Sequence, residues 1–184
     1  MPVLDHLMEE HRKAMAMIEQ LSQSQEGPQR EATLQELTMA LQKHMAVEER
    51  FIYPFVQSTL GAEKAQGAEA EHGLARDGLT KMQQLVDQPG FEAAVDMVRA
   101  GIEHHVHEEE EQIFPELRSR ASEQLDQLDP DQMEQQVQAG SSSTSGSNEP
   151  TKQELYDRAR EAGVQGRSQM SKDELADAVS KQSR

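Results

Sequence analysis

Residues 1–120 carry apolar residues at intervals of three and four positions, the spacing that places side chains on one face of an α-helix. Breakers at Gly27-Pro28, Gly61 and Pro89-Gly90 divide this region into four stretches. Four amphipathic helices with short connections predict an all-α protein, an antiparallel up-and-down four-helix bundle. The apolar and histidine positions of the four stretches are 4, 7, 8, 11, 15, 18 and 21; 34, 37, 41, 44, 47, 51 and 55; 65, 68, 72, 75, 79, 82 and 86; and 91, 94, 95, 98, 102, 105 and 113, with Glu109 on the same face as the last set.

Two prolines fall near the ends of the second and fourth stretches. Pro54 and Pro115 lack the backbone N–H that a helix interior needs. We therefore expect them to kink or end these helices, or to begin short continuations.

The chain changes character after residue 120. Residues 121–150 contain no Lys or Arg and include the run AGSSSTSGSNEP, so we expect a flexible acidic, Ser- and Gly-rich linker. Part of 121–138 is not of low complexity and can continue a helix. Residues 151–184 recover a helical pattern with two capping boxes, which predicts a small helix–loop–helix. The expected organisation is a bundle over 1–120, a linker and this C-terminal motif.

The bundle sequence is an internal repeat. The block HMAVEERFIYP at 44–54 returns as HVHEEEEQIFP at 105–115, a shift of 61 residues. The same shift places Glu10-His11 on Glu71-His72. The first two helices therefore correspond to the last two, and the bundle is predicted to be two copies of one helical hairpin.

Six histidines and glutamates share the register of this repeat and interrupt the apolar faces. Burying two carboxylates without a partner costs several kcal/mol each, and a bound pair of cations would remove that cost. A single histidine on an apolar face is usually a packed core residue, but six positions in one register favour metal ligands. Imidazole and carboxylate together suit iron, manganese or zinc. The six are His11, His44, Glu48, His72, His105 and Glu109.

At these residues the chain resembles the hemerythrin-like proteins of the HHE cation-binding group. The resemblance covers about residues 1–120 and rests on His11, His44-x-x-x-Glu48, His72 and His105-x-x-x-Glu109. It implies a non-haem centre of two iron ions with an oxo or hydroxo bridge, manganese or zinc being the alternatives. The two glutamates would bridge the ions, and the four histidines would complete each side.

The chain departs from the oxygen-carrying members of that family. They have a further histidine one turn after the third-helix histidine, where this chain has Arg76. Each iron would then keep an open position, compatible with O₂, NO or peroxide. Arg76 could place a donor near a bound anion, or pair with a bundle glutamate. Tyr53, which aligns with Phe114 in the repeat, could support the centre. The remaining histidines His6, His104 and His107 are expected on solvated faces.

Composition excludes several classes of function. A net charge of −16 argues against a general binder of nucleic acid or anionic membranes. No apolar run reaches the roughly 20 residues that a membrane span needs. The acidic start MPVLDHLMEEH does not resemble a signal peptide, and the absence of Cys excludes disulfides and thiol chemistry. A cytoplasmic location is the expectation.

The C-terminal stretch resembles the Rho N-terminal-like or SAP-like helix–loop–helix motif, through K-x-E-L-Y, G-x-x-G-R-S and K-x-E-L. Its 7 basic and 6 acidic residues favour docking to a protein over binding nucleic acid.

Three functions remain open. The first is a di-iron protein that binds O₂, NO or peroxide in stress response or iron homeostasis. The second is an enzyme that turns over peroxide or NO, or donates iron for iron–sulfur cluster repair. The third is a regulator that binds nucleic acid through residues 151–184.

Overall fold

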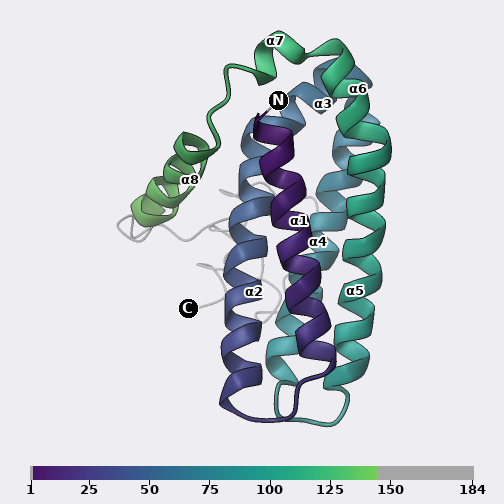
Figure 1. Ribbon diagram of the computed structural model, residues 1–184, viewed down its shortest axis with the longest axis vertical. Coiled ribbons are helices and arrows are strands. Elements are labelled where there is room, and N and C mark those ends of the chain that lie inside the picture. The colour runs from purple at the N-terminus through teal and green to yellow at the C-terminus, as the bar shows by residue number, and fades with distance from the viewer. Residues whose placement is uncertain (1, 145–184) are drawn as a thin grey trace, which may run out of the picture. The chain divides into compact units, whose positions relative to one another are not determined.

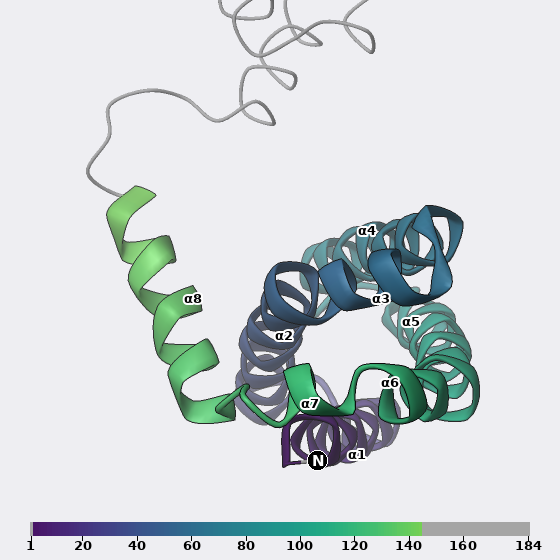
Figure 2. The ribbon, with the colours of Figure 1, turned by 90° about the horizontal axis from the view of Figure 1, so that it is seen from above.

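Four long helices form the body of the protein. The computed structural model describes residues 2–144, with side chains described through residue 139, and this part of the chain contains helices and no strand. The helices α1 (Pro2–Ser22), α2 (Pro28–Val47), α4 (Ala62–Gln84) and α5 (Phe91–Glu108) run side by side (Figure 1). Seen from above, they form a ring in that order (Figure 2). The predicted up-and-down bundle of two helical hairpins is confirmed.

The bundle turns lie at the predicted breakers. Gly61 and Gly90 adopt φ values of 104° and 100°, a conformation that side chains with a Cβ atom rarely adopt. Pro28 begins α2, where its missing N–H costs no helical hydrogen bond.

The second and fourth helices continue past their prolines through a widened turn. The π-helical segments η1 (Glu48–Ile52) and η2 (Glu109–Ile113) connect α2 to α3 (Tyr53–Leu60) and α5 to α6 (Phe114–Arg120). In each, the first residue of the following helix donates its amide N–H to the carbonyl of the glutamate five positions earlier. The prolines then fall in the first turn of α3 and α6, so of the expected alternatives the short continuation is observed. Single π turns inside helices often mark functional sites.

Two apolar clusters fill the bundle, one on each side of a polar layer. One cluster includes Leu4, Leu7 and Ile52, and the other includes Ile18, Leu37 and Val98. The buried histidines and glutamates lie in the helical positions between these two sets.

Helical structure extends beyond the predicted end of the bundle at residue 120. Residues expected to begin a flexible linker form α7 (Ser122–Leu125) and α8 (Pro130–Thr144). Leu125 and Met133 are buried in the first apolar cluster, and the compact unit ends at Gln138. This agrees with the expectation that part of 121–138 can continue a helix. The C-terminal motif at 151–184 lies outside the described residues.

Within the compact unit, α8 is joined to the first hairpin by ion pairs. Glu134 lies 2.9 Å from both His6 Nε2 and Lys43 Nζ. No helix in the described range is long and apolar enough to span a membrane.

Candidate metal centre

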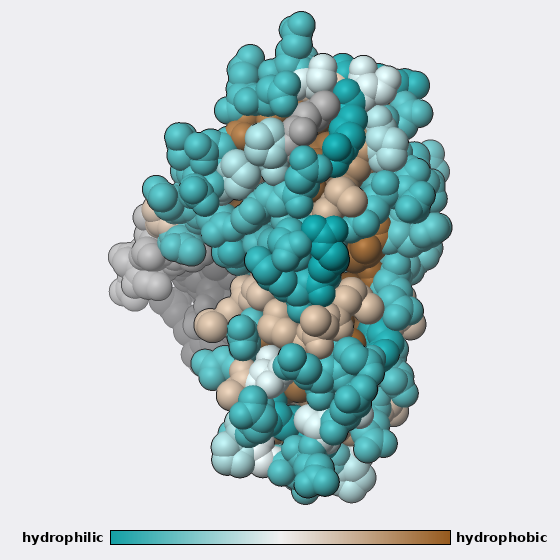
Figure 3. Space-filling view, viewed as in Figure 1, coloured by the Kyte–Doolittle hydropathy of each residue, from teal (hydrophilic) through white to brown (hydrophobic). Residues whose placement is uncertain are grey.

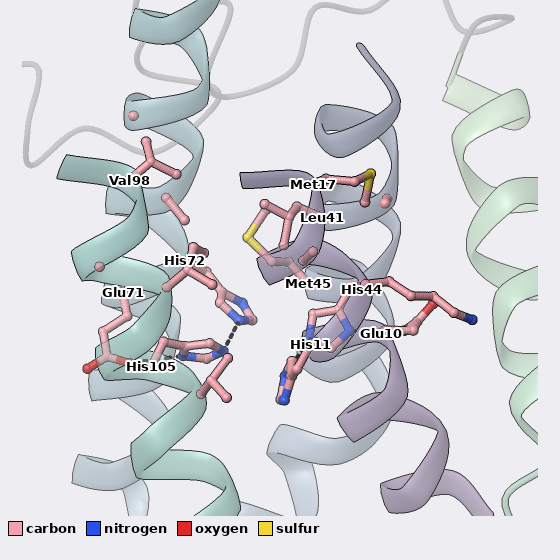
Figure 4. Close-up of a pocket in the computed structure, with 18 of the residues that line it drawn as sticks. Glu10, His11, Met17, Leu41, His44, Met45, Glu71, His72, Val98 and His105 are labelled. Carbon is pink, nitrogen blue, oxygen red and sulfur yellow. Dashed lines mark hydrogen bonds and ion pairs between the residues drawn. The ribbon is translucent and has the colours of Figure 1, made fainter. Parts of the chain in front are cut away.

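The structure brings together all six side chains that the sequence selects. One histidine comes from each long helix, and the two glutamates are the first residues of η1 and η2. Figure 4 shows the four imidazoles turned toward one another between the helices. Each of the six residues is at most 5% exposed: His11, His44, Glu48, His72, His105 and Glu109.

The imidazoles form two close pairs. The Nε2 atoms of His11 and His44 are 3.0 Å apart, and those of His72 and His105 are 3.3 Å apart. Each pair comes from one hairpin, so the two copies of the sequence repeat place their histidines in the same arrangement.

The two glutamates lie between the histidine pairs. Glu48 Oε2 is 3.1 Å from His44 Nε2 and 3.3 Å from His72 Nε2, one atom from each pair. Glu109 Oε2 is 3.4 Å from His11 Nε2 and 3.5 Å from His105 Nε2, again one from each pair. Each carboxylate is therefore within reach of both ends of the centre.

A second set of glutamates orients the imidazoles from outside. Each histidine has its Nδ1 atom 2.9–3.0 Å from a carboxylate oxygen, which directs Nε2 inward. Such outer carboxylates fix the ring orientation of metal-binding histidines and raise their basicity. Sequence reasoning missed this role, although all four lie in the repeat register. The pairs are His11 with Glu110, His44 with Glu10, His72 with Glu49, and His105 with Glu71.

These outer contacts also connect the hairpins. Glu10 and Glu71 each orient a histidine of their own hairpin. Glu49 and Glu110 each orient a histidine of the other hairpin. The geometry of the centre therefore depends on how the two hairpins dock.

Three of the four oxygens of the inner carboxylates are buried without a hydrogen-bond partner. Both oxygens of Glu48 and the Oε2 atom of Glu109 accept no hydrogen bond. Burial raises the pKa of Glu109, and the charge of Glu48 raises it further. Burial acts in the same direction on Glu48, but the neighbouring His44 and His72 hold its pKa well below the usual range.

Two of the imidazoles, His44 and His72, hold protons tightly in this carboxylate-rich interior. Burial lowers the pKa of His44, but Glu48 and Glu10 outweigh it and raise the value to about 10. Similarly, Glu48 and Glu49 overcome burial and raise the pKa of His72 to about 9. The interior therefore attracts positive charge strongly, whether protons or metal cations.

Tyr53 lies closer to the centre than the sequence suggested. Its hydroxyl is 2.9 Å from His72 Nε2 and donates to Glu109 Oε1 at 3.1 Å. Burial, together with the charges of Glu48 and Glu109, raises the pKa of Tyr53, so the hydroxyl keeps its proton. The equivalent residue of the other repeat, Phe114, stacks near His11 with ring centroids 6.1 Å apart and has no such group. This difference makes the two halves of the centre chemically unequal.

Arg76 lies outside the centre. It donates to Glu49 Oε1 at 2.7 Å and is 40% exposed, which matches the expected alternative of an ion pair with a bundle glutamate. His104 and His107 are exposed and do not join the six. His6 is half-buried beside Glu10 and Glu134.

The donor set fits a site for metal cations. Four inward Nε2 atoms and unpartnered carboxylate oxygens are the ligands that iron, manganese and zinc accept. The fit rests on buried acceptors that the protein itself does not satisfy, a rare condition in folded proteins.

Comparison with known proteins agrees with this geometry. Residues 3–117 match the Hemerythrin HHE cation binding domain. The chain is 26% identical over 126 residues to an uncharacterised hemerythrin-like protein of Schizosaccharomyces pombe, covering 66% of this chain and 62% of that relative. The chain therefore spans less than two thirds of the relative's length. No solved structure matches the chain.

Proposed function

Because the chain belongs to the hemerythrin HHE cation-binding family, we propose that its buried centre holds two non-haem iron ions and binds O₂, NO or peroxide. In this assignment Glu48 and Glu109 bridge the ions. His11 and His44 complete one side, and the two histidines of the second hairpin complete the other. Manganese and zinc are the alternatives for the same donors.

The unpartnered oxygens of Glu48 and Glu109 are the observation that carries the proposal. A buried carboxylate oxygen without a hydrogen bond is strongly unfavourable. Here two such groups lie among four imidazole Nε2 atoms that outer carboxylates hold in place. A pair of cations would satisfy both sets at once.

Two imidazoles and two shared carboxylates leave room at each ion for an external ligand. When bound, a reduced iron pair supplies electrons to O₂, NO or peroxide. The chain's own residues bury the centre and keep one proton at the Tyr53 hydroxyl. A role in the response to oxygen, nitrosative or oxidative stress, or in iron homeostasis, follows from these ligands.

Tyr53 favours an enzyme as the second candidate. Turnover of peroxide needs a proton donor close to the reacting atoms, whereas reversible binding of a gas does not. The Tyr53 hydroxyl is a buried donor at the edge of the centre.

Metal analysis of protein purified from iron-replete cells tests the proposal, with the visible spectrum of the same sample. We expect two irons per chain and the absorption of a bridged ferric pair. Stopped-flow mixing of the reduced protein with O₂, NO and peroxide then separates the candidates. A stable oxygenated species supports a binding protein, and rapid peroxide or NO consumption supports an enzyme. A full-length protein that takes up no transition metal would contradict both.

Replacing Tyr53 with Phe is expected to leave two metal ions bound and to slow peroxide turnover by about 100-fold, the usual loss on removing a general acid. The substitution copies Phe114 and makes the two halves of the centre alike. Phe114→Tyr is the matched control, because it adds a hydroxyl at the equivalent position and keeps Tyr53. Unchanged peroxide kinetics in Tyr53→Phe would show that the hydroxyl serves only packing.

A further inference from the structure

A large cavity continues from the histidine layer into the half of the bundle that contains the second apolar cluster, with Leu41 and Val98. Its volume is about 780 Å³. A water molecule takes up roughly 30 Å³ in the liquid, and organic ligands occupy pockets of roughly 300–1,000 Å³. The cavity is therefore far larger than O₂, NO or hydrogen peroxide requires.

Apolar side chains form the walls. Met17, Leu41, Met45 and Val98 line the cavity, and Figure 4 shows them gathered on one side of the four histidines. Small residues leave the space between these walls empty. They are Ala14, Ala40, Ala75 and Gly101.

The lining reaches the surface in two grooves related by the repeat. The groove between α1 and α2 contains Lys13 and Ala40, and the groove between α4 and α5 contains the equivalent positions Leu74 and Gly101. Figure 3 shows apolar residues gathered about halfway along the face that carries α1 and α2, among hydrophilic neighbours. At the second groove, Leu74 is 72% exposed and Met97 is 57% exposed.

The charged side chains around the cavity are mostly carboxylates. Lys43 is already paired with Glu10 at 3.1 Å and with Glu134 at 2.9 Å. Lys13 lies 3.9 Å from Glu9, and Glu36 and Asp77 also line the cavity. The excess of carboxylates over amines disfavours an anionic ligand.

We propose that this cavity binds a neutral aliphatic molecule with one small polar end, such as a medium-chain alcohol or alkyl hydroperoxide. The alkyl chain lies between the methionine, leucine and valine walls, and the hydroxyl or hydroperoxyl end faces the histidine layer. The proposal that alkyl hydroperoxides are substrates rests on the proposed function. Binding of an alcohol in the cavity does not depend on it. The apolar walls accommodate the alkyl chain, and the excess of carboxylates disfavours a fatty acid.

Calorimetry on the full-length, metal-loaded chain tests this proposal with 1-octanol as the probe. We expect saturable binding of one 1-octanol per chain and at least tenfold weaker binding of octanoate, and octylammonium is measured beside them. Metal content is measured in the same samples. A chain without metal that still binds 1-octanol would contradict the proposed metal centre but not the cavity proposal. Absent or non-saturable binding of 1-octanol would overturn the proposal, and so would tighter binding of either ion.

A pair of repeat-related substitutions supplies the structural test. Ala40→Leu with Gly101→Leu narrows both grooves and is expected to weaken 1-octanol binding at least tenfold with two metal ions retained. A Cβ atom at Gly101 meets no neighbour within 4 Å, and Leu favours a helix more than Gly does, so the fold is kept. Gly67→Leu is the control, because Gly67 is also an exposed helical glycine with open space but does not line the cavity. Equal affinity in the double variant and the control would place the probe elsewhere.

Discussion

Metal analysis of the Glu48→Gln and Glu109→Gln variants is expected to give well below two ions per chain. Each carboxylate lies within 3.5 Å of an Nε2 atom in both histidine pairs, so its loss weakens both ends of the centre. Glutamine keeps the size of the side chain but removes the charge that attracts a cation. A free metal concentration of about 1,000 times the dissociation constant stabilises a protein by about 4 kcal/mol. The variants are therefore expected to lose about 10 °C or more of the metal-dependent rise in melting temperature.

Circular dichroism and a matched control variant distinguish loss of metal from loss of the fold. Circular dichroism of the metal-free variants should show the same helix content as the metal-free parent, because the two apolar clusters remain. Glu111→Gln is the matched control, since Glu111 is exposed within the same π-helical segment as Glu109. Two ions per chain in both variants, equal to this control, would mean that Glu48 and Glu109 do not bridge.

The centre could be predicted from the sequence because a repeat makes chance patterns improbable. One histidine on an apolar face, such as His11, carries little information. The same residue types recurring after 61 positions in both helices of a hairpin require a shared reason. The helical period then places these side chains inside the bundle without knowledge of any contact.

The remaining contacts depend on how the hairpins dock, which the helical period does not give. Glu49 and Glu110 reach histidines of the opposite hairpin, so no spacing within one helix identifies their partners. Tyr53 follows a π-helical turn, which adds a residue and rotates the chain relative to a regular α-helix. An α-helical period continued past Glu48 therefore could not place the Tyr53 hydroxyl beside Glu109. Arg76 lies one turn from His72, but its long side chain leads outward to an acceptor at the surface.

The same limit explains the region after residue 120. Its composition matches a linker, but Leu125 and Met133 need few apolar partners to dock short helices on an existing core. Composition averages over such isolated contacts, whereas packing depends on them individually.

The difference in melting temperature between metal-loaded and metal-free protein is expected to widen as pH rises from about 6.5 to 9. In the metal-free protein, the pKa values of His44 and His72 are raised from 6.5 to about 10 and about 9. Their protons therefore stabilise the fold fully below pH 6.5, and this contribution disappears as pH rises through the folded-state values. Metal binding requires both imidazoles without these protons, so the apparent metal affinity rises about tenfold per pH unit for each proton released. Above pH 6.5 the metal-free form loses stability as pH rises, while the metal-loaded form keeps its stability, because its imidazoles carry no proton in either the folded or the unfolded state.

Differential scanning calorimetry across this range, with the free metal concentration fixed by a chelating buffer, measures both curves. In Glu10→Gln, the difference in melting temperature is expected to increase less with pH, because Glu10 lies 2.9 Å from His44 and helps to raise its pKa. Glu9→Gln is its control, as Glu9 is exposed and pairs with Arg12 and Lys13 instead. If the difference stays constant or narrows between pH 6.5 and 9 in the parent, protons and metal do not compete for His44 and His72. These imidazoles would then have to be neutral before metal arrives, which the surrounding carboxylates oppose.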